Sequence, residues 1–137
     1  MNERILLVDD DRYVLSSLKK ALEKNGYNVD TAETAGAAID KLRVRSYDLA
    51  LIDQVLPDMK GTDLLAKAKN ELQQTVKFII TGYPTARTGA SAREEKADAF
   101  ILKPIAITEL LSIIRAFFEE EQIDQDEEKK FTLSEVT

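Results

Sequence analysis

Five short segments of the chain are rich in apolar residues and are separated by longer segments with a different pattern. We predict strands over residues 4–8, 28–32, 49–53, 77–81 and 99–102. Several of these runs are apolar at consecutive positions rather than at alternate ones. Strands of that kind are covered on both faces, as they are in parallel sheets. The pattern therefore predicts a buried parallel sheet.

Between the strands, apolar residues recur three and four positions apart, which is the spacing of a helix with one buried face. Such stripes run from Val14 to Leu22, Ala38 to Leu42, Leu64 to Leu72 and Leu110 to Phe118. Thr34 can cap the second helix, and Asn25-Gly26 is a stop signal after the first. The segment 84–96 has only alanines on any face, so it predicts a weaker helix.

The regular alternation of strands and helices predicts an α/β sandwich with right-handed crossovers. Ligands of such sheets bind beyond the carboxyl ends of the strands. Polar side chains follow four of the five strands at that end: Asp9-Asp10-Asp11, Asp53, Thr81 and Lys103. Brought together, these carboxylates, this hydroxyl and this ammonium suit a divalent cation and a phosphoryl group.

Each of these residues also has an ordinary structural interpretation. Asp11 can cap the helix that follows it. Asp53 and Thr81 can be turn residues, and Lys103 can be a solvated surface lysine. Taken singly, these interpretations are favoured. They do not explain why chemically useful groups follow four different strands.

The clustered aspartates give the strongest indication of chemistry. Like charges a few ångströms apart either raise a pKa or bind a cation. Mg²⁺ is the natural candidate, because it takes oxygen ligands from carboxylates and keeps waters for a phosphate. Asp53 can then act as a nucleophile toward phosphorus, with Lys103 and Thr81 beside the phosphoryl oxygens. A protonated carboxylate pair used for acid–base catalysis is the alternative.

The composition narrows the classes of protein. The chain has 137 residues, 44% hydrophobic and 32% charged, as expected of one soluble globular domain. It has no cysteine and no histidine, which excludes disulfides, zinc sites and catalytic triads built from those residues, and phosphohistidine on this chain. No apolar run approaches the roughly 20 residues of a membrane span. We expect no signal peptide, because the first residues run directly into a predicted strand. We expect a cytoplasmic location.

The net charge of −6 is concentrated at the C-terminal end. Residues 1–118 contain 17 acidic and 17 basic side chains, whereas residues 119–137 contain 8 acidic and 2 basic ones. Direct nucleic-acid binding relies on basic surfaces and is therefore not expected. We interpret residues 123–137 as an acidic tail or the start of a linker.

Four motifs in a fixed order carry a family resemblance. They are ILLVDDD at 5–11, LALIDQVLPDMKGTDLL at 49–65, FIITG at 78–82 and AFILKP at 99–104. Over about residues 4–120 the chain resembles response-regulator receiver domains, the phosphoacceptor half of two-component signalling. The resemblance implies a flavodoxin-like (βα)5 sandwich with a five-stranded parallel sheet in the order 2-1-3-4-5. It also implies a receiver domain over residues 1–122.

The resemblance implies roles for the polar residues at the strand ends. Asp53 would be the phosphorylated residue, and Asp9 and Asp10 would be the acidic pair of the metal site. Asp10, Asp53 and the backbone carbonyl of Val55 would be the protein ligands of Mg²⁺.

A second set of residues corresponds to the family's switch. Thr81 would be the switch hydroxyl, Lys103 the lysine that contacts the phosphoryl group, and Phe100 the switch aromatic. The Lys103-Pro104 peptide bond is often cis in the family. Phe100 has an alternative interpretation as core packing.

The same resemblance implies partners. A histidine kinase or a histidine phosphotransfer protein would supply the phosphoryl group, since this chain has no histidine. The fourth helix, fifth strand and fifth helix would form the output surface toward an effector, and the fourth and fifth helices could form a homodimer. No contact with nucleic acid or membrane is expected of this chain.

Departures from the family pattern are few. Lys60 stands where an acid is common before Gly61, Ala97 replaces the usual glycine before the last strand, and 84–96 departs most.

Two other functions stay open. An aspartyl phosphatase would usually place a general acid at the position of Val55, and a degenerate receiver would act only as a docking module. The chain is therefore expected to be a signalling domain rather than an enzyme.

Overall fold

The sheet contains five parallel strands, as the apolar runs predict. In the computed structural model, which describes residues 2–119, the strands are β1 (Arg4–Val8), β2 (Asn28–Ala32), β3 (Leu49–Asp53), β4 (Val76–Thr81) and β5 (Ala99–Leu102). They pair in the order β2-β1-β3-β4-β5. This is the flavodoxin-like order, so the predicted fold and topology are confirmed.

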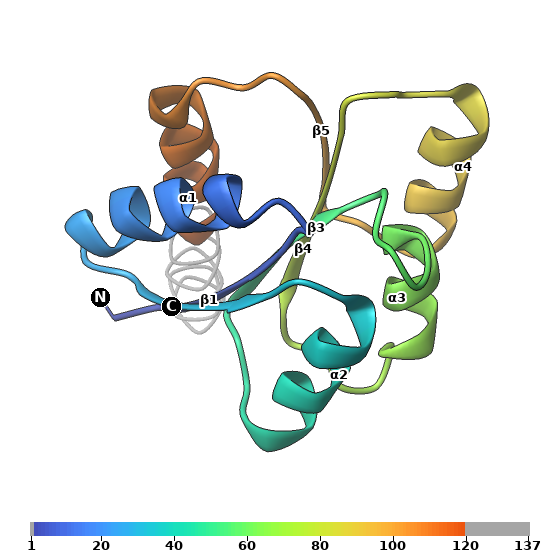
Figure 1. Cartoon of the computed structure of the whole chain (residues 1–137), viewed down its shortest axis with the longest axis horizontal. Coiled ribbons are helices and arrows are strands. Elements are labelled where there is room, and N and C mark those ends of the chain that lie inside the picture. The colour runs from blue at the N-terminus through green and yellow to red at the C-terminus, as the bar shows by residue number, and fades with distance from the viewer. Residues whose placement is uncertain (1, 120–137) are drawn as a thin grey trace, which may run out of the picture. The chain divides into compact units, whose positions relative to one another are not determined.

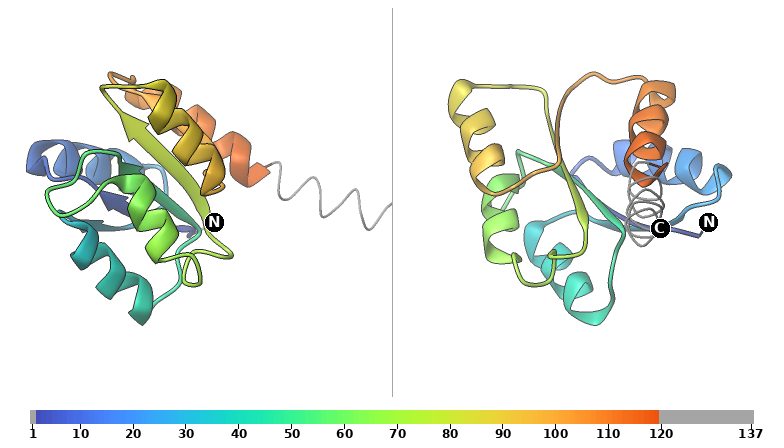
Figure 2. Two further views of the ribbon diagram at one scale, coloured as in Figure 1. Left: turned by 90° about the vertical axis from the view of Figure 1, so that its right-hand side faces the viewer. Right: turned by 180° about the vertical axis from the view of Figure 1, so that it is seen from behind.

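Helices follow the first four strands and cover both faces of the sheet. They are α1 (Arg12–Lys24), α2 (Ala35–Val44), α3 (Gly61–Lys67) and α4 (Ala86–Glu94). Helix α1 lies on one face, and α2, α3 and α4 lie on the other (Figures 1 and 2). The stripe predicted from Leu64 to Leu72 is helical only to Lys67, but Leu72 stays buried in the turns that follow. The apolar spacing there reports burial rather than a continuous helix.

The chain forms two compact units, Met1–Ile105 with the whole sheet and Ala106–Thr137. In the second unit residues 107–119 are helical, and Leu110, Leu111 and Ile114 are buried. The predicted fifth helix is confirmed over these residues. The expected tail at 123–137 lies outside the described residues.

Two predicted helix caps are present. Asp11 Oδ1 accepts hydrogen bonds from the backbone amides of Tyr13 and Val14 at 2.9 and 3.2 Å. Thr34 Oγ1 accepts one from the amide of Ala37 at 3.0 Å. The structural interpretation of Asp11 as a cap is therefore confirmed.

Helix α4 forms from the weakest of the predicted helical patterns. Ala92 is its one buried residue, and Thr85 caps it by accepting a hydrogen bond from the amide of Thr88. After the helix, Lys96 adopts a left-handed φ of 60°, while the amide of Ala97 donates to the carbonyl of Ala92 at 2.9 Å. This closure requires a left-handed residue just before position 97, which favours glycine at 96. The conformation that favours glycine thus falls on Lys96, one residue before Ala97.

The core explains which strands have unbroken apolar runs. The side chains of β1 and β3 that lie inside the sheet are almost fully buried on both faces: Ile5, Leu6, Leu7, Val8, Leu49, Ala50, Leu51 and Ile52. The edge strand β2 is more polar, because it pairs only with β1. The unbroken runs of β1 and β3 thus belong to strands covered on both faces, whereas β5 has such a run, AFIL, at the other edge of the sheet.

The register brings the polar strand ends to one edge of the sheet. Val8 pairs with Ile52, Asp53 with Ile80, and Thr81 with Leu102. The residues that follow β1 and β5, together with the last residues of β3 and β4, consequently lie side by side. Within residues 2–119 no helix has the length and apolarity needed to cross a membrane.

Candidate functional site

Two buried aspartates share one lysine at the carboxyl edge of the sheet. Lys103 Nζ donates to Asp53 Oδ2 at 3.0 Å and to Asp9 Oδ2 at 3.1 Å. The other carboxylate oxygens accept backbone hydrogen bonds, Asp53 Oδ1 from the Val55 amide at 3.1 Å and Asp9 Oδ1 from the Asp11 amide at 2.9 Å. Each aspartate is only 6% exposed. Both carboxylates are thus held in place by the segment that follows their own strand.

Asp10 completes an acidic cluster. One carboxylate oxygen from each of Asp9, Asp10 and Asp53 lies within 4.8 Å of the other two, and Asp10 is exposed to solvent. The structure therefore brings together the three aspartates that the sequence predicts for a metal site. Asp11 lies beside them but serves as the cap of α1.

The charges of this cluster do not balance. The cluster contains three carboxylates, and the ammonium of Lys103 contacts two of them, those of Asp9 and Asp53. Burial raises the pKa of the Asp9 carboxyl and the charge of Asp53 adds to the rise, while the Asp11 amide and Lys103 oppose it. Burial lowers the pKa of Lys103, but its hydrogen bond to Asp53 and the charges of both aspartates outweigh this and raise that pKa. The excess negative charge favours either a bound proton or a bound cation.

The donor set fits a divalent cation. The ligand atoms are hard carboxylate oxygens gathered within 4.8 Å of one another, and one of the three residues, Asp10, is exposed to solvent. Such oxygens are the ligands that Mg²⁺ and Ca²⁺ take in proteins. The cluster therefore has the donor chemistry of a divalent-cation site.

Thr81 lies beside the cluster, at the end of β4. Its side chain is fully buried, and its Oγ1 accepts a hydrogen bond from the Tyr83 amide at 3.1 Å. The carbonyl of Thr81 accepts from the amide of Lys103 at 2.8 Å. A backbone hydrogen bond thus holds Thr81, the predicted hydroxyl residue, next to Lys103, the predicted lysine.

Phe100 is half-buried in β5. It packs against the core cluster that also contains Ile52, Ile79 and Ala92, on the face of the sheet that carries α2, α3 and α4. The Lys103-Pro104 peptide bond after β5 is cis, as the resemblance implied.

The loop of residues 54–60 after Asp53 is held by a residue that sequence reasoning passed over. Gln54 is buried, its Oε1 accepts from the Thr62 amide at 3.0 Å, and its Nε2 donates to Thr62 Oγ1 at 3.1 Å. The Gly61 amide donates to the carbonyl of Gln54 at 2.9 Å. A Cβ at Gly61 would lie 2.6 Å from the carbonyl oxygen of Asp53, so only glycine allows this approach. A polar residue directly after a buried strand was the available signal, but it did not reveal the partner.

Asp58 was also missed. It lies at the far end of the same loop, and its carboxylate accepts the backbone amides of Ala35 and Gly36, both at 2.9 Å. Since those partners are more than twenty residues away in the sequence, no local pattern could have indicated the contact.

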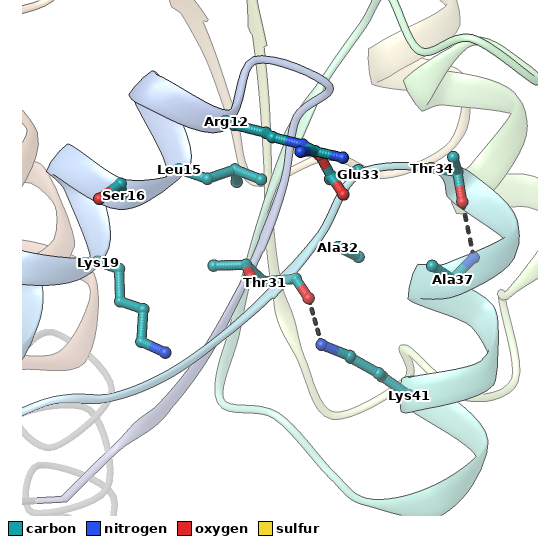
Figure 3. A pocket seen from close by; sticks show the side chains of 10 residues that line it. All are labelled: Arg12, Leu15, Ser16, Lys19, Thr31, Ala32, Glu33, Thr34, Ala37 and Lys41. Carbon is teal, nitrogen blue, oxygen red and sulfur yellow. Dashed lines mark hydrogen bonds and ion pairs between the residues drawn. The ribbon is translucent and has the colours of Figure 1, made fainter.

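A cavity of about 610 Å³ lies elsewhere, at the free edge of β2 between α1 and α2 (Figure 3). Arg12 reaches from α1 to Glu33 with an Nε–Oε1 distance of 2.6 Å, and Lys41 of α2 donates to the carbonyl of Thr31 (Figure 3). Lys41 thereby covers a backbone acceptor of the edge strand. The cavity contains no residue of the acidic cluster, so its size does not make it the reaction site.

Comparison with known proteins points to one family. The family described as the response regulator receiver domain matches residues 5–115. A CheY-like response regulator receiver domain protein from Methanospirillum hungatei JF-1 is 39% identical, with a TM-score of 0.86 over 90% of this chain and 99% of its own. The non-phosphorylated HemR receiver domain from Leptospira biflexa is 32% identical, with a TM-score of 0.77 over 83% of this chain and 92% of its own.

A curated protein that is similar in sequence is also a response regulator. The response regulator MprA of Mycobacterium bovis (strain BCG / Pasteur 1173P2) is 30% identical over 116 residues, which cover 85% of this chain and 50% of that protein. The chain thus spans about half the length of the curated relatives that it matches.

Proposed function

Because this chain belongs to the family of response regulator receiver domains, which are signalling phosphoacceptors rather than enzymes, we propose that Asp53 accepts the phosphoryl group. The observation that carries this assignment is the environment of its carboxylate. Asp53 is buried at the end of β3, and Val55 and Lys103 each bind one of its oxygens. Such a carboxylate is oriented before a phosphoryl donor arrives.

The proposed step is a displacement at phosphorus. A carboxylate oxygen of Asp53 forms a bond to phosphorus while the bond from phosphorus to the donor's imidazole nitrogen breaks, and the product is an acyl phosphate. Asp9, Asp10, Asp53 and the carbonyl of Val55 would hold Mg²⁺. Bound there, the ion would supply neutralisation of the charge on the phosphoryl oxygens.

Lys103 and Thr81 are proposed to bind the transferred group. Lys103 already lies 3.0 Å from Asp53 Oδ2, so it can follow the new negative charge onto a phosphoryl oxygen. The Thr81 hydroxyl accepts from the Tyr83 amide and keeps its own proton to donate. Movement of Thr81 toward the phosphoryl group would free space for the ring of Phe100 to turn.

The output is proposed to involve α4 and β5, together with the helix at 107–119. Helix α4 has a single buried residue, Ala92, and an element with so few apolar contacts can rearrange at little cost in free energy. The effector of this surface and a homodimer through α4 and the last helix remain predictions.

The phosphoryl donor is proposed to be a histidine kinase or a histidine phosphotransfer protein, as membership of a two-component family implies. A cytoplasmic location likewise remains a prediction from the sequence. A metal-dependent aspartyl phosphatase is disfavoured by Val55, which offers no general acid two residues after Asp53.

Incubation with acetyl phosphate and Mg²⁺ tests the proposal. We expect intact-protein mass spectrometry to detect one labile phosphoryl group per chain, which disappears in Asp53→Asn and when Mg²⁺ is removed by a chelator. Asp63→Asn is the matched control, since it removes the same charge from an exposed position in the first turn of α3. Undiminished labelling of Asp53→Asn would reject the assignment, and steady turnover of acetyl phosphate without a labelled protein would favour an enzyme.

A further inference from the structure

Asp58 connects the loop after the nucleophile to a different part of the fold. Its Oδ1 accepts the Ala35 amide and its Oδ2 accepts the Gly36 amide, both at 2.9 Å. Both amides belong to the first turn of α2. One side chain thus makes two hydrogen bonds across the gap between the 54–60 loop and α2.

These contacts complete the N-terminus of α2. The first amides of a helix have no partner within the helix. Thr34 accepts the amide of Ala37 through its hydroxyl, and Asp58 accepts the amides of Ala35 and Gly36. The hydrogen bonds from Ala35 and Gly36 lower the pKa of the Asp58 carboxyl, so the residue bonds as a carboxylate at neutral pH. The positive end of α2 stabilises that negative charge.

The loop is therefore held at both ends. At its base, Gln54 is bonded to Thr62 and Gly61, and at its tip Asp58 is bonded to α2. Met59, next to Asp58, packs against the core, and a bridge joins Val55 to Lys60. Val55 lies between these anchors and donates its amide to Asp53 Oδ1. The position of Val55 consequently depends on both ends of the loop.

We propose that Asp58 is a positioning residue of the metal site. The hydrogen bonds that Asp58 accepts from Ala35 and Gly36 fix the position of the 54–60 loop. The loop in turn fixes the backbone of Val55 beside Asp53. This inference rests on the proposed function, because Val55 is assigned there as a metal ligand. Groups that orient metal ligands without touching the metal commonly alter metal affinity 10- to 100-fold.

A cap with no further role is the competing explanation. Asp58 would then stabilise α2 but leave the metal site unchanged. Asp58→Ala separates the two explanations, because it removes both acceptors while all the carboxylates of the cluster remain. Asp63→Ala is the matched control: it also removes an exposed aspartate, here from the first turn of α3, but leaves the hydrogen bonds to α2 in place.

The test is calorimetric titration of the whole protein with Mg²⁺ alone. We expect the Kd for Mg²⁺ to rise on the order of 10-fold in Asp58→Ala, and to be unchanged in Asp63→Ala. Asp58→Asn keeps one acceptor oxygen, so its Kd should lie between those of the wild type and Asp58→Ala, and it provides the test if Asp58→Ala does not fold. Labelling of Asp53 at saturating Mg²⁺ should reach the wild-type level in both Asp58 variants.

The outcomes are distinct. Shifted amide resonances of Ala35 and Gly36 would show that the hydrogen bonds to Asp58 are lost in a folded Asp58→Ala or Asp58→Asn. An unchanged Kd for Mg²⁺ in such a variant overturns the inference and leaves the proposed function intact. An equal rise of Kd in Asp63→Ala also overturns it, since the effect would then come from charge. Absence of Mg²⁺ binding by the wild type overturns the metal assignment and this inference with it.

Discussion

The two segments that flank the site differ in how they are held. The 54–60 loop after β3 is bonded to α2 through Asp58 and to the start of α3 through Gln54. The segment 82–96 after β4 has hydrogen bonds that join close neighbours along the chain, such as Thr85 with Thr88. Its Tyr83 side chain is 82% exposed.

This difference suggests a division of work within one domain. A nucleophile and a metal ion need a fixed geometry, which many anchors supply. A signalling surface needs two states of similar free energy, which is easier to achieve with few anchors. We infer that the loop after β3 fixes the geometry of the nucleophile and the metal ion, and that the segment after β4 changes conformation in response to phosphorylation.

Two glycine substitutions should show the largest difference between the 54–60 loop and the segment 82–96. In Gly61→Ala the new Cβ would meet backbone atoms of Asp53 and Gln54 at 2.6 and 3.1 Å, and neither atom can move away without shifting the loop. We expect a loss of about 3 kcal/mol in the free energy of unfolding, together with weaker Mg²⁺ binding. Denaturant titration measures the first effect and calorimetry the second.

Gly89→Ala is the counterpart on the other side. Nothing lies within 4 Å of a Cβ at this position inside α4, so alanine should stabilise the helix by about 1 kcal/mol. The same denaturant titration should therefore give changes of opposite sign for the two variants. A stabilised Gly61→Ala, or a strongly destabilised Gly89→Ala, would contradict the inference that the 54–60 loop is closely packed and the segment 82–96 is not.

A smaller effect is expected at Asp9. Burial and the charge of Asp53 raise the pKa of its carboxyl. The folded state therefore gains stability from a protonated Asp9 at low pH, and that gain is lost as the pH rises through the raised pKa. Asn resembles the protonated form. Without Mg²⁺, Asp9→Asn should be more stable than the wild type at neutral pH by up to about 1 kcal/mol.

The pH dependence distinguishes this explanation from others. The advantage of Asp9→Asn should shrink as the pH falls and vanish below the ordinary pKa of an aspartate. Asp10→Asn, which removes a charge from the exposed member of the cluster, is the control and should show a smaller effect. A wild type that is more stable than Asp9→Asn at every pH would mean that the ion pair with Lys103 outweighs burial.

The sequence predicted the parts of the molecule that depend on local pattern and on strand ends. The unbroken runs Ile5–Val8 and Leu49–Ile52 identified interior strands, because those residues are buried on both faces of the sheet. The alignment of parallel strands then brought Asp9 and Asp53 together with Lys103. These predictions needed no knowledge of distant contacts.

What escaped prediction depends on contacts between segments distant in the sequence or on backbone conformation. The hydrogen bonds of Asp58 with Ala35 and Gly36 join the 54–60 loop to the first turn of α2, and nothing in the Pro57-Asp58 pair indicates the partner. The left-handed conformation of Lys96 was not predicted, because a lysine, unlike a glycine, gives no signal of a positive φ.

Hydrogen exchange before and after phosphorylation tests the division between the two segments most directly. With acetyl phosphate and Mg²⁺, we predict altered exchange in the backbone amides of residues 86–94 and continued protection of residues 54–60. Lys103→Ala should still bind Mg²⁺ and accept the phosphoryl group, but show little change at 86–94. Equal changes in both segments of the wild type, or a change confined to 54–60, would contradict the account.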